Sequence, residues 1–393
     1  MFQIGQEEID AVARVIRSGN LFRYHEPSEC GRFEQRYAKY LSAQYVGMTA
    51  SGTGALTAAL VGLGVGPGDE VIVPAHTYMA TAVAVVAVGA IPVIVDIDES
   101  ICLDPAALED AIGPHTRAVI PVHMWGQVCD MEAILRIAEK HNLLVVEDAC
   151  QAVGGGYRGR MAGTLGHAGA FSFNHFKNMT CGEGGAVVTD DARVFQRAQC
   201  AIDCHRYYWN DREANFTGFA FSGARASEIE GAILNVQLDR LPAMMQALRD
   251  QKTRILGETR DAGLIPVPLH SPDHECGAVT MFALPTAPQA DAFAHATGGT
   301  VLARTGRHTY NEWDPILHRQ GGPMPVMNAF ELPQNQRCRM NYAPDMCPRS
   351  LAILRRTVSL ANHPDHTPQQ VAERVQAIRD AASQVLGDAA HAS

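Results

Sequence analysis

A lysine between two apolar runs is the side chain of this sequence best suited to covalent chemistry. Lys177 follows Ala168-Gly-Ala-Phe-Ser-Phe173, which is typical of a buried strand, and precedes a flexible turn, Gly182-Glu-Gly-Gly185, and a second apolar run. Burial disfavours the charged form of a lysine, and the neutral amine can form a Schiff base with an aldehyde. Taken alone, the segment also fits a lysine whose stem packs while its ammonium group reaches solvent.

A glycine-rich turn, Gly52-Thr53-Gly54, could bind a phosphate. It follows Tyr45-Val-Gly-Met48 and opens an apolar helical run, so that backbone N–H groups at the helix start would be free to bind an anion. No Gly-Lys-Ser/Thr follows, so the turn is not a P-loop, and Thr57 stands where a dinucleotide fingerprint needs its third glycine. A tight strand-to-helix turn without a ligand explains the same glycines.

Three further residues are candidates for the same site. Asp148 ends a hydrophobic strand, where a carboxylate needs a partner such as a protonated ring nitrogen, unless it caps a following helix. Tyr78 lies just past another apolar strand, where its ring could cover a flat cofactor or pack in the core. Ser172 alternates with two phenylalanines, so its side chain faces away from theirs and is a candidate phosphate ligand.

Together these residue types match the needs of pyridoxal 5′-phosphate. This cofactor needs an amine for its aldehyde, a carboxylate for its pyridinium nitrogen, a cover for its ring and a cup for its phosphate. Lys177, Asp148 and Tyr78 would fill the first three roles. Gly52-Thr53-Gly54 and Ser172 would fill the fourth. We therefore predict a pyridoxal phosphate site.

The elements that must position these residues alternate between strands and helices. Such a β-α-β order predicts an α/β fold with a mostly parallel sheet covered on both faces, and ligands bind beyond the carboxyl ends of its strands. The expected strands are Glu70–Pro74, Ile91–Asp96, Ala118–His123 and Leu143–Asp148, and the expected helices between them are 77–88, 105–112 and 130–141.

The second part of the chain has fewer strands. We place a domain boundary near Pro242, which divides the chain into an N-terminal, cofactor-binding domain (1–241) and a small C-terminal α+β domain (242–393). The smaller domain is expected to contain strands at 278–284 and 300–304 and a closing helix at 369–385. Its loop from Arg307 to Pro344 is too long for a passive connection and is a candidate for function. Candidate substrate contacts in irregular segments, each of which also fits a packing or surface position, are Arg23, Tyr207, Tyr208, Trp209, His308, Tyr310 and Trp313.

Composition narrows the range of partners. The chain has 393 residues, of which 47% are apolar and 19% charged, enough for a sizeable core. A net charge of −10 without a block of Lys or Arg argues against nucleic acid and against an anionic membrane surface. Ten cysteines without a CxxC pair suit a reducing compartment, and we expect a cytoplasmic protein without a signal peptide or membrane span. Cys200-x-x-x-Cys204-His205 invites a zinc assignment, but no second ligand pair accompanies it, so we expect no metal.

An ordered series of motifs runs along almost the whole chain. The series includes Ile4-Gly-Gln-Glu-Glu-Ile9, Ser51-Gly-Thr53, Gly66-Pro-Gly-Asp-Glu-Val-Ile-Val-Pro74, Glu147-Asp-Ala-Cys-Gln151, Phe171-Ser-Phe-x-x-x-Lys177 and Gly182-Glu-Gly-Gly-Ala-Val-Val-Thr189. With these motifs the chain resembles the DegT/DnrJ/EryC1/StrS family of pyridoxal-phosphate-dependent aminotransferases, often called sugar aminotransferases. The resemblance implies the type I aminotransferase fold.

The resemblance also implies roles for single residues. They are Lys177 as the Schiff-base lysine, Asp148 at the ring nitrogen, Gln151 near the cofactor hydroxyl, Tyr78 over the ring, and Ser172 and Thr53 at the phosphate. Members of the family complete each phosphate site across a homodimer from a Gly-x-Asn-x-Arg stretch, so the resemblance implies a homodimer with shared sites. Here the stretch reads Gly223-Ala-Arg225 without the asparagine, and Arg225 is the remaining candidate for that contact.

The implied activity is amino transfer from an amino acid, L-glutamate or L-glutamine, to a keto group of a sugar, nucleotide-sugar or related polyhydroxylated ketone. Family dehydratases carry histidine at the lysine position, whereas this chain has Lys177 there and His175 two residues earlier, which favours amino transfer. The alternatives are a dehydratase that uses the same cofactor, or an aminotransferase for a non-sugar ketone in a biosynthetic pathway. A non-catalytic binding protein on this fold and a Rossmann oxidoreductase fit the sequence less well.

Overall fold

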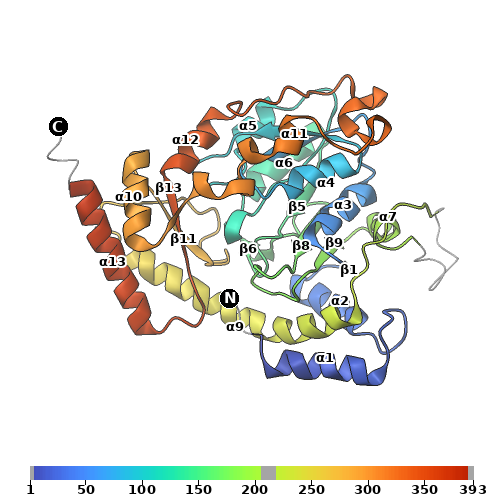
Figure 1. Cartoon of the computed structure of the whole chain (residues 1–393), viewed down its shortest axis with the longest axis horizontal. Coiled ribbons are helices and arrows are strands. Elements are labelled where there is room, and N and C mark those ends of the chain that lie inside the picture. Colours follow the sequence, from blue (N-terminus) through green and yellow to red (C-terminus); the bar gives the residue numbers. More distant parts are fainter. Residues whose placement is uncertain (1–3, 205–217, 388–393) are drawn as a thin grey trace.

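A seven-stranded sheet organises the larger part of the molecule (Figure 1). The computed structural model describes residues 4–204 and 218–387. In spatial order the strands are β1 Tyr45–Thr49, β9 Gly185–Thr189, β8 Ala168–Ser172, β5 Leu144–Asp148, β4 Thr116–Val119, β2 Glu70–Pro74 and β3 Ile91–Val95. Pairing is parallel from β8 to β3, whereas β9 is antiparallel to both β1 and β8. The predicted α/β class with a mostly parallel sheet is therefore confirmed.

Helices cover both faces of this sheet. The helices on one face are α3 Gly52–Leu63, α4 Ala80–Ala87 and α7 Ala192–Ile202, and those on the other are α2 Glu29–Leu41, α5 Pro105–Asp110 and α6 Met131–His141. Neighbouring strand residues point to opposite faces: Val146 belongs to the core beneath α3 and α4, and Val145 to the core beneath α5 and α6. Burial on both faces explains why the strands are continuously apolar.

Side-chain caps fix where the helices begin. The side chains of Ser51, Asp130 and Asp191 each accept a hydrogen bond from a backbone N–H in the first turn of α3, α6 and α7, respectively. Helix α3 ends at Gly64, whose φ of 76° is the left-handed conformation that glycine adopts readily. Because Ser51 stands only two residues after the last residue of β1, the cap sets the start of α3 at the edge of the sheet where β5 and β8 end.

A 31-residue helix, α9 Glu228–Glu258, links this part to a second core. It packs against α1 Gln6–Ser18 and α2 at its start and contributes Ile255 to the second core near its end. That core surrounds an antiparallel sheet of β10 Ile265–Pro266, β11 Val279–Ala283, β13 Thr357–Ala361 and β12 Thr300–Val301, with α10 Ala287–Thr297 and α13 Pro368–Gly387. In Figure 1, α9 runs beneath both parts. A small hairpin, β6 Gly156–Tyr157 and β7 Arg160–Met161, lies apart from both sheets.

Residues 302–356 return from the small sheet to the large core. Tyr310 and Trp313 are fully buried there, and the Tyr310 hydroxyl donates to the Pro344 carbonyl at 2.9 Å. The segment consists of short helices, which are η2 Leu302–Arg304, η3 Gly306–His308, η4 Tyr310–Glu312, α11 Asp314–Leu317, η5 Pro325–Met327, η6 Ala329–Glu331, η7 Pro333–Asn335 and α12 Pro348–Arg356. The chain thus passes between the two cores more than once, and α9 is continuous through Pro242. The division into 1–241 and 242–393 remains a prediction.

Two strands end at least three residues earlier than the sequence predicts. Strand β4 ends at Val119 rather than His123, because Pro121 has no N–H to continue the ladder, although Ile120 still donates to the Ile72 carbonyl at 2.8 Å. The strand expected at 300–304 ends at Val301, where the backbone turns into η2. Residues 120–123 therefore lie in the connection that follows β4, and residues 302–304 lie in η2.

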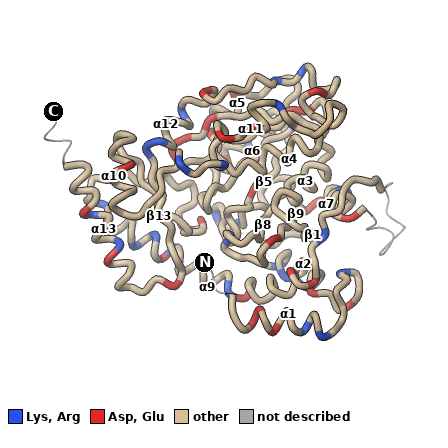
Figure 2. The backbone as a smooth tube through the Cα atoms, viewed as in Figure 1, with Lys and Arg blue, Asp and Glu red and all other residues tan. Residues whose placement is uncertain are grey.

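The surface carries both signs of charge. In Figure 2, Lys and Arg are interspersed with Asp and Glu along the tube. Among the residues described, no helix is both long and apolar enough to cross a membrane.

Candidate active site

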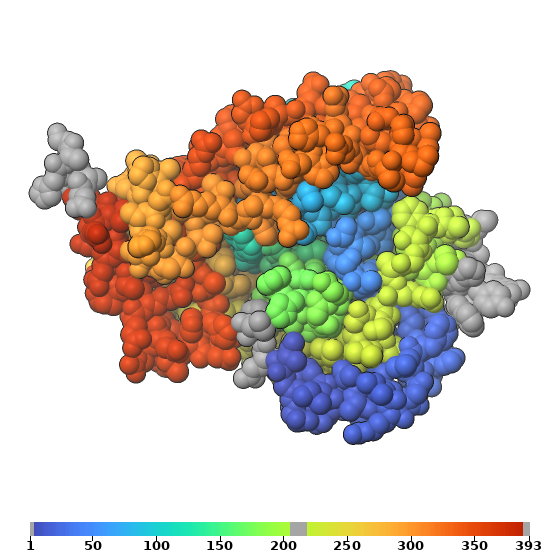
Figure 3. Space-filling view, viewed as in Figure 1, coloured from blue at the N-terminus to red at the C-terminus, as the bar shows by residue number. Residues whose placement is uncertain are grey.

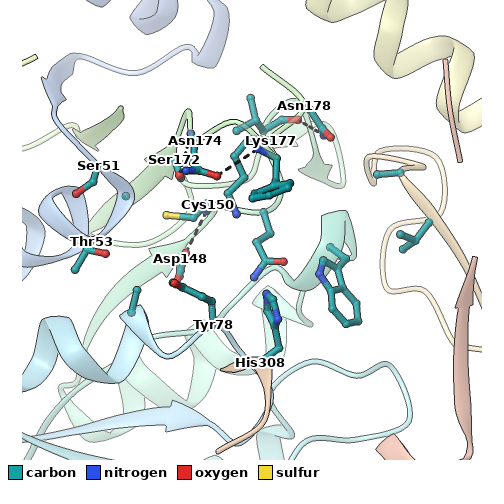
Figure 4. A pocket seen from close by; sticks show the side chains of 18 of the residues that line it. Ser51, Thr53, Tyr78, Asp148, Cys150, Ser172, Asn174, Lys177, Asn178 and His308 are labelled. Carbon is teal, nitrogen blue, oxygen red and sulfur yellow. Dashed lines mark hydrogen bonds between the residues drawn. The ribbon is translucent and has the colours of Figure 1, made fainter. Parts of the chain in front are cut away.

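A cavity of about 760 Å³ opens at the carboxyl ends of β5 and β8. Figure 3 shows this face of the molecule hollowed near its centre, between the orange C-terminal segment and the light green segment that contains Lys177. Most of the predicted site residues line the cavity, namely Gly52, Thr53, Tyr78, Asp148, Gln151, Ser172 and Lys177. Figure 4 shows the labelled ones converging from separate elements. The structure thus brings these predicted residues together.

Lys177 lies in the loop between β8 and β9, as the apolar runs on either side of it predict. Its backbone N–H donates to the Asn174 carbonyl at 2.9 Å, and its side chain is half-buried and lines the cavity. Within residues 4–204 and 218–387, no hydrogen bond or ion pair involves its amine. Gly185, at the far end of the loop, has to be glycine, because a Cβ there would lie 2.4 Å from the Ser51 carbonyl oxygen. The loop therefore presents a free amine to the cavity.

Asp148 is a buried carboxylate without a cationic partner. It is 4% exposed and lines the cavity. Its Oδ2 accepts from the Thr81 hydroxyl at 2.7 Å, and its Oδ1 from the Cys150 N–H at 3.1 Å. No helix starts after β5, so the helix-cap alternative for Asp148 is wrong. No Lys, Arg or His of the described chain pairs with this carboxylate, so a cationic ligand would compensate its burial.

The start of α3 forms the wall next to Ser172. A Cβ on Gly52 would lie 2.7 Å from the Cβ of Ser172 and 2.8 Å from the Sγ of Cys150, so only glycine fits there. Ser172 is 6% exposed, and its hydroxyl accepts from the Asn174 N–H at 3.3 Å. The N–H groups of Gly52 and Thr53 lie in the first turn of α3, where helix geometry leaves them without an internal acceptor. This corner can bind a phosphate.

Two predicted residues do not line the cavity in the single chain. Gly54 donates its N–H to the Ser51 hydroxyl at 3.1 Å, which commits that amide to the helix cap. Arg225 pairs with β1 through a bridge to Thr49, and its guanidinium lies 3.5 Å from Asp203 Oδ2. Its side chain is 45% exposed, so it is open to a neighbouring molecule.

An aromatic wall lines the cavity opposite Lys177, and Trp125 is the part of it that the sequence does not reveal. Tyr78 packs on His308 with ring centroids 5.4 Å apart, and His308 packs on Trp125 at 5.6 Å. Trp125 has a φ of 50°, a strained conformation for a bulky residue. Positive φ at a tryptophan leaves no sequence signal, and His308 reaches Tyr78 only through tertiary packing.

His308 offers one hydrogen-bond acceptor to the cavity. Burial lowers the pKa of its ring, and the charges of Lys177 and Arg307 lower it further, so the ring is neutral at neutral pH. Its Nδ1 lies 3.1 Å from the Thr305 carbonyl, which can only accept, so Nδ1 carries the proton. Nε2 is then the acceptor, and it suits a ligand hydroxyl.

Other candidates fall outside this site. Arg23 pairs with Glu34 at 2.6 Å and lines a different cavity, and Tyr310 and Trp313 are core residues. Tyr207, Tyr208, Trp209 and His205 lie outside the described residues. No cluster of three His, Cys, Asp or Glu side chains that could hold a metal ion occurs among the described residues.

Residues 2–379 match the model of the DegT/DnrJ/EryC1/StrS aminotransferase family. The chain belongs to this family. The resemblance suggested by the motifs is therefore confirmed over nearly the whole length, and with it the predicted aminotransferase fold.

Similar proteins include several named aminotransferases. A putative L-glutamine:3-amino-2,3-dideoxy-scyllo-inosose aminotransferase from Streptoalloteichus tenebrarius is 38% identical over 268 residues, which are 67% of this chain and 64% of that protein. GDP-perosamine synthase from Caulobacter vibrioides is 42% identical over 230 residues, 57% of this chain and 59% of that protein. The matched regions thus span about 60% of the length of these relatives.

Solved structures match over a greater length. 3-Amino-5-hydroxybenzoic acid synthase has a TM-score of 0.78 at 28% identity, with 97% of each chain covered. DesV from Streptomyces venezuelae, solved in complex with a ketimine intermediate, has a TM-score of 0.73 at 30% identity and covers 96% of this chain and 94% of its own. These likenesses place the sheet, α9 and the small part of this protein in an arrangement already known for the family.

The residues present fit pyridoxal 5′-phosphate. The cavity has a free amine at Lys177, and at Asp148 a buried carboxylate that lacks a counter-ion. It also has a helix start with a glycine that no other residue could replace, at Gly52. An amine, an anion and a phosphate corner on the walls of one cavity are the contacts that this cofactor needs.

Proposed function

We propose that this protein is a pyridoxal 5′-phosphate-dependent aminotransferase that moves an amino group from an amino acid to a keto group of a polyhydroxylated acceptor. The observation that carries the proposal is that Lys177 and Asp148 line the same cavity and that neither has a charged partner in the described chain. An unpaired buried carboxylate is costly unless a ligand supplies the positive charge. Family membership supports the same activity.

When bound, the cofactor supplies an aldehyde that takes up the amino group and a ring that withdraws electrons. Lys177 Nζ would take a proton from the substrate carbon and deliver it to the aldehyde carbon of the cofactor, since it is an amine that lines the cavity without a hydrogen-bond partner in the described chain. Asp148 would hold a proton at the ring nitrogen, and its two donors, Thr81 and the Cys150 N–H, keep the carboxylate oriented for this. Tyr78 and Trp125 would keep water from the reacting atoms.

A polyhydroxylated acceptor is supported by two observations. The Nε2 acceptor of His308 suits a substrate hydroxyl. The similar proteins named above are designated as acting on scyllo-inosose derivatives or as making GDP-perosamine. We propose L-glutamine or L-glutamate as the donor. Dehydration is less favoured, because His175 is not among the cavity-lining residues and its ring packs on Phe176 at 5.3 Å.

Trapping the cofactor tests the central claim. Purified protein supplied with pyridoxal 5′-phosphate should turn yellow, and borohydride should leave the cofactor attached to a peptide that contains Lys177. Lys177→Arg keeps the charge but should give no attachment. A wild-type protein that stays colourless and takes up no cofactor contradicts the proposal.

We further propose that the protein acts as a homodimer with shared sites. Phe176 is 85% exposed beside Lys177, and Phe221 is 45% exposed close to Arg225 in the chain. In a homodimer, the partner subunit would bury these apolar side chains. The partner's copy of Arg225 would complete the phosphate corner. The nine cysteines other than Cys204 are free thiols, which supports our expectation of a reducing, cytoplasmic location.

A further inference from the structure

Arg307 is a cation of the cavity wall without an anion to balance it. It lies in η3, lines the cavity, and its guanidinium stands over the ring of Tyr78 at 5.4 Å from the ring centroid. Within residues 4–204 and 218–387, its guanidinium makes no hydrogen bond or ion pair. By contrast, Arg304, three residues earlier, pairs with Asp291 at 2.7 Å and does not line the cavity.

The backbone at Arg307 is held in place, so the position of the arginine is built into the fold. Its carbonyl oxygen accepts from the Met79 N–H at 3.0 Å and from the Trp313 indole N–H at 2.9 Å. Trp313 is fully buried. Two residues on, Thr309 forms a bridge to His76, just past the end of β2. These bonds fix the C-terminal segment beside the turn that carries Tyr78.

The acidic groups of the cavity do not compensate this charge. Asp148 is engaged by Thr81, and Glu183 accepts from the Asn174 amide at 2.9 Å. Neither carboxylate pairs with Arg307. Burial is the main cause that lowers the pKa of His308, and the charges of Lys177 and Arg307, which line the same cavity, lower it further. The guanidinium of Arg307 is therefore available to an anion that enters the cavity.

We propose that Arg307 is the anion-binding residue of the substrate pocket and takes a carboxylate or phosphate group of the molecule that undergoes amino transfer. A guanidinium is a planar fork that binds either group through two parallel hydrogen bonds, and stacking on an aromatic ring orients that fork. The inference rests on the proposed function. It adds that one of the two substrates must carry an anionic group within reach of Tyr78.

The anionic group that Arg307 binds belongs either to the amino donor or to the acceptor. Two unreactive probes distinguish these two cases. Glutarate has the carbon skeleton of glutamate without its amino group, and inorganic pyrophosphate represents the diphosphate of a nucleotide-sugar. Binding of each probe to the cofactor-saturated protein can be measured by titration calorimetry. Neither probe can undergo amino transfer, so the binding affinities can be interpreted even if the proposed reaction is wrong.

The variants are Arg307→Gln, Arg307→Lys and the matched control Arg304→Gln. Arg307→Gln should weaken one probe about ten- to hundredfold, as expected for loss of a charge-assisted hydrogen bond. Arg307→Lys should lose less, because it keeps the charge without the fork. Arg304→Gln should bind both probes as the wild type does. Cofactor uptake and borohydride attachment at Lys177 should be unchanged in all three.

Each outcome decides the inference. Weaker glutarate binding assigns Arg307 to the amino donor, and weaker pyrophosphate binding assigns it to the acceptor. Unchanged binding of both probes by Arg307→Gln, equal losses in Arg304→Gln, or a wild-type protein that binds neither probe overturns the proposal. Failure of the proposed function would appear separately, as a wild-type protein that takes up no cofactor.

Discussion

The Thr81 hydroxyl donates a hydrogen bond to the Asp148 carboxylate at 2.7 Å, and both side chains are buried. Thr81 stands in the first turn of α4, and Asp148 ends β5, so a helix on one face of the sheet orients a carboxylate at the sheet edge. The Thr81 hydroxyl also lies 2.7 Å from that of Thr77. The orientation of the Asp148 carboxylate thus depends on the hydroxyl group of Thr81, which carries no charge.

Replacing Thr81 tests this dependence. Thr81→Val keeps the shape but leaves one carboxylate oxygen without its donor, which we expect to cost about 1–2 kcal/mol and to weaken cofactor binding roughly tenfold. Thr81→Ser keeps the hydroxyl and should bind nearly as the wild type does. Equal affinities of the valine and serine variants, measured by fluorescence titration with pyridoxal 5′-phosphate, would show that Thr81 has no orienting role.

Neutralising Asp148 tests its assigned role directly. Asp148→Asn preserves the side-chain shape and can still contact the Cys150 N–H, but it cannot hold a proton at a ring nitrogen. We expect it to bind the cofactor and to lose most of the rate of amino transfer, measured as the spectral change on adding L-glutamate or L-glutamine. Near-normal rates would mean that the carboxylate only stabilises the turn after β5.

His76 predicts an acid-sensitive fold. Burial lowers the pKa of its ring from 6.5 to about 3, and its Nε2 has no partner in the described chain. The unfolded chain binds a proton at His76 below pH 6.5 and the native chain does not, so stability falls as the pH falls from 6.5 towards 3. The loss should reach about 2 kcal/mol at pH 5.

The loss can be measured by urea unfolding at pH 7.5 and pH 5. His76→Gln lacks the titrating ring, so its difference in unfolding free energy between the two pH values should be smaller by about that amount. Carboxylates elsewhere contribute equally to both proteins and cancel in the comparison. A variant that loses as much stability as the wild type would assign the acid sensitivity to other groups.

Mixed dimers test whether Arg225 serves the partner's site. Lys177→Ala and Arg225→Ala should each be weak or inactive at limiting cofactor. If Arg225 acts across the dimer, a mixed dimer has one site with both defects and one site with an intact lysine and an intact arginine. Mixing the variants under conditions of subunit exchange should therefore restore activity approaching half of wild type per mixed dimer. Demonstrated exchange without recovery would place Arg225 in its own chain's site or in none.

One part of the site, formed by Gly52, Asp148 and Lys177, was predictable because it lies at the ends of continuous apolar strands and at glycine turns. β5 ends at Asp148, β8 leads to Lys177, and Gly52 begins α3, so local patterns alone brought these residues to the carboxyl edge. The packing of Gly52 against Ser172 explains the first glycine of the turn, whereas the amide of Gly54 belongs to a helix cap. Here the sequence patterns and the structure bring the same residues to one cavity.

The positions of Arg307 and Trp125 in the cavity wall could not be predicted, because contacts between residues far apart in the sequence determine them. Arg307 stands more than 200 residues from Tyr78 in the chain and reaches it through the bonds of its own carbonyl group to Met79 and Trp313. The positive φ of Trp125 follows from packing rather than from a turn-forming residue. The unusual length of the loop 307–344 marked this segment, and His308 was one of several candidate substrate contacts, but no sequence pattern singled out Arg307 or Trp125.

The continuous helix α9 has a mechanical consequence for the pocket. The cavity has walls from both cores: Lys177 belongs to the large part, and Val279 and Ala361 belong to the small sheet. Any rotation of the small part would have to flex α9, and Pro242 is its softest point, because proline donates no bond to the turn before it. The width of the cavity opening and the curvature of α9 would then change together. Stiffening α9 by Pro242→Ala would therefore slow substrate binding and product release, but not the rate of amino transfer itself.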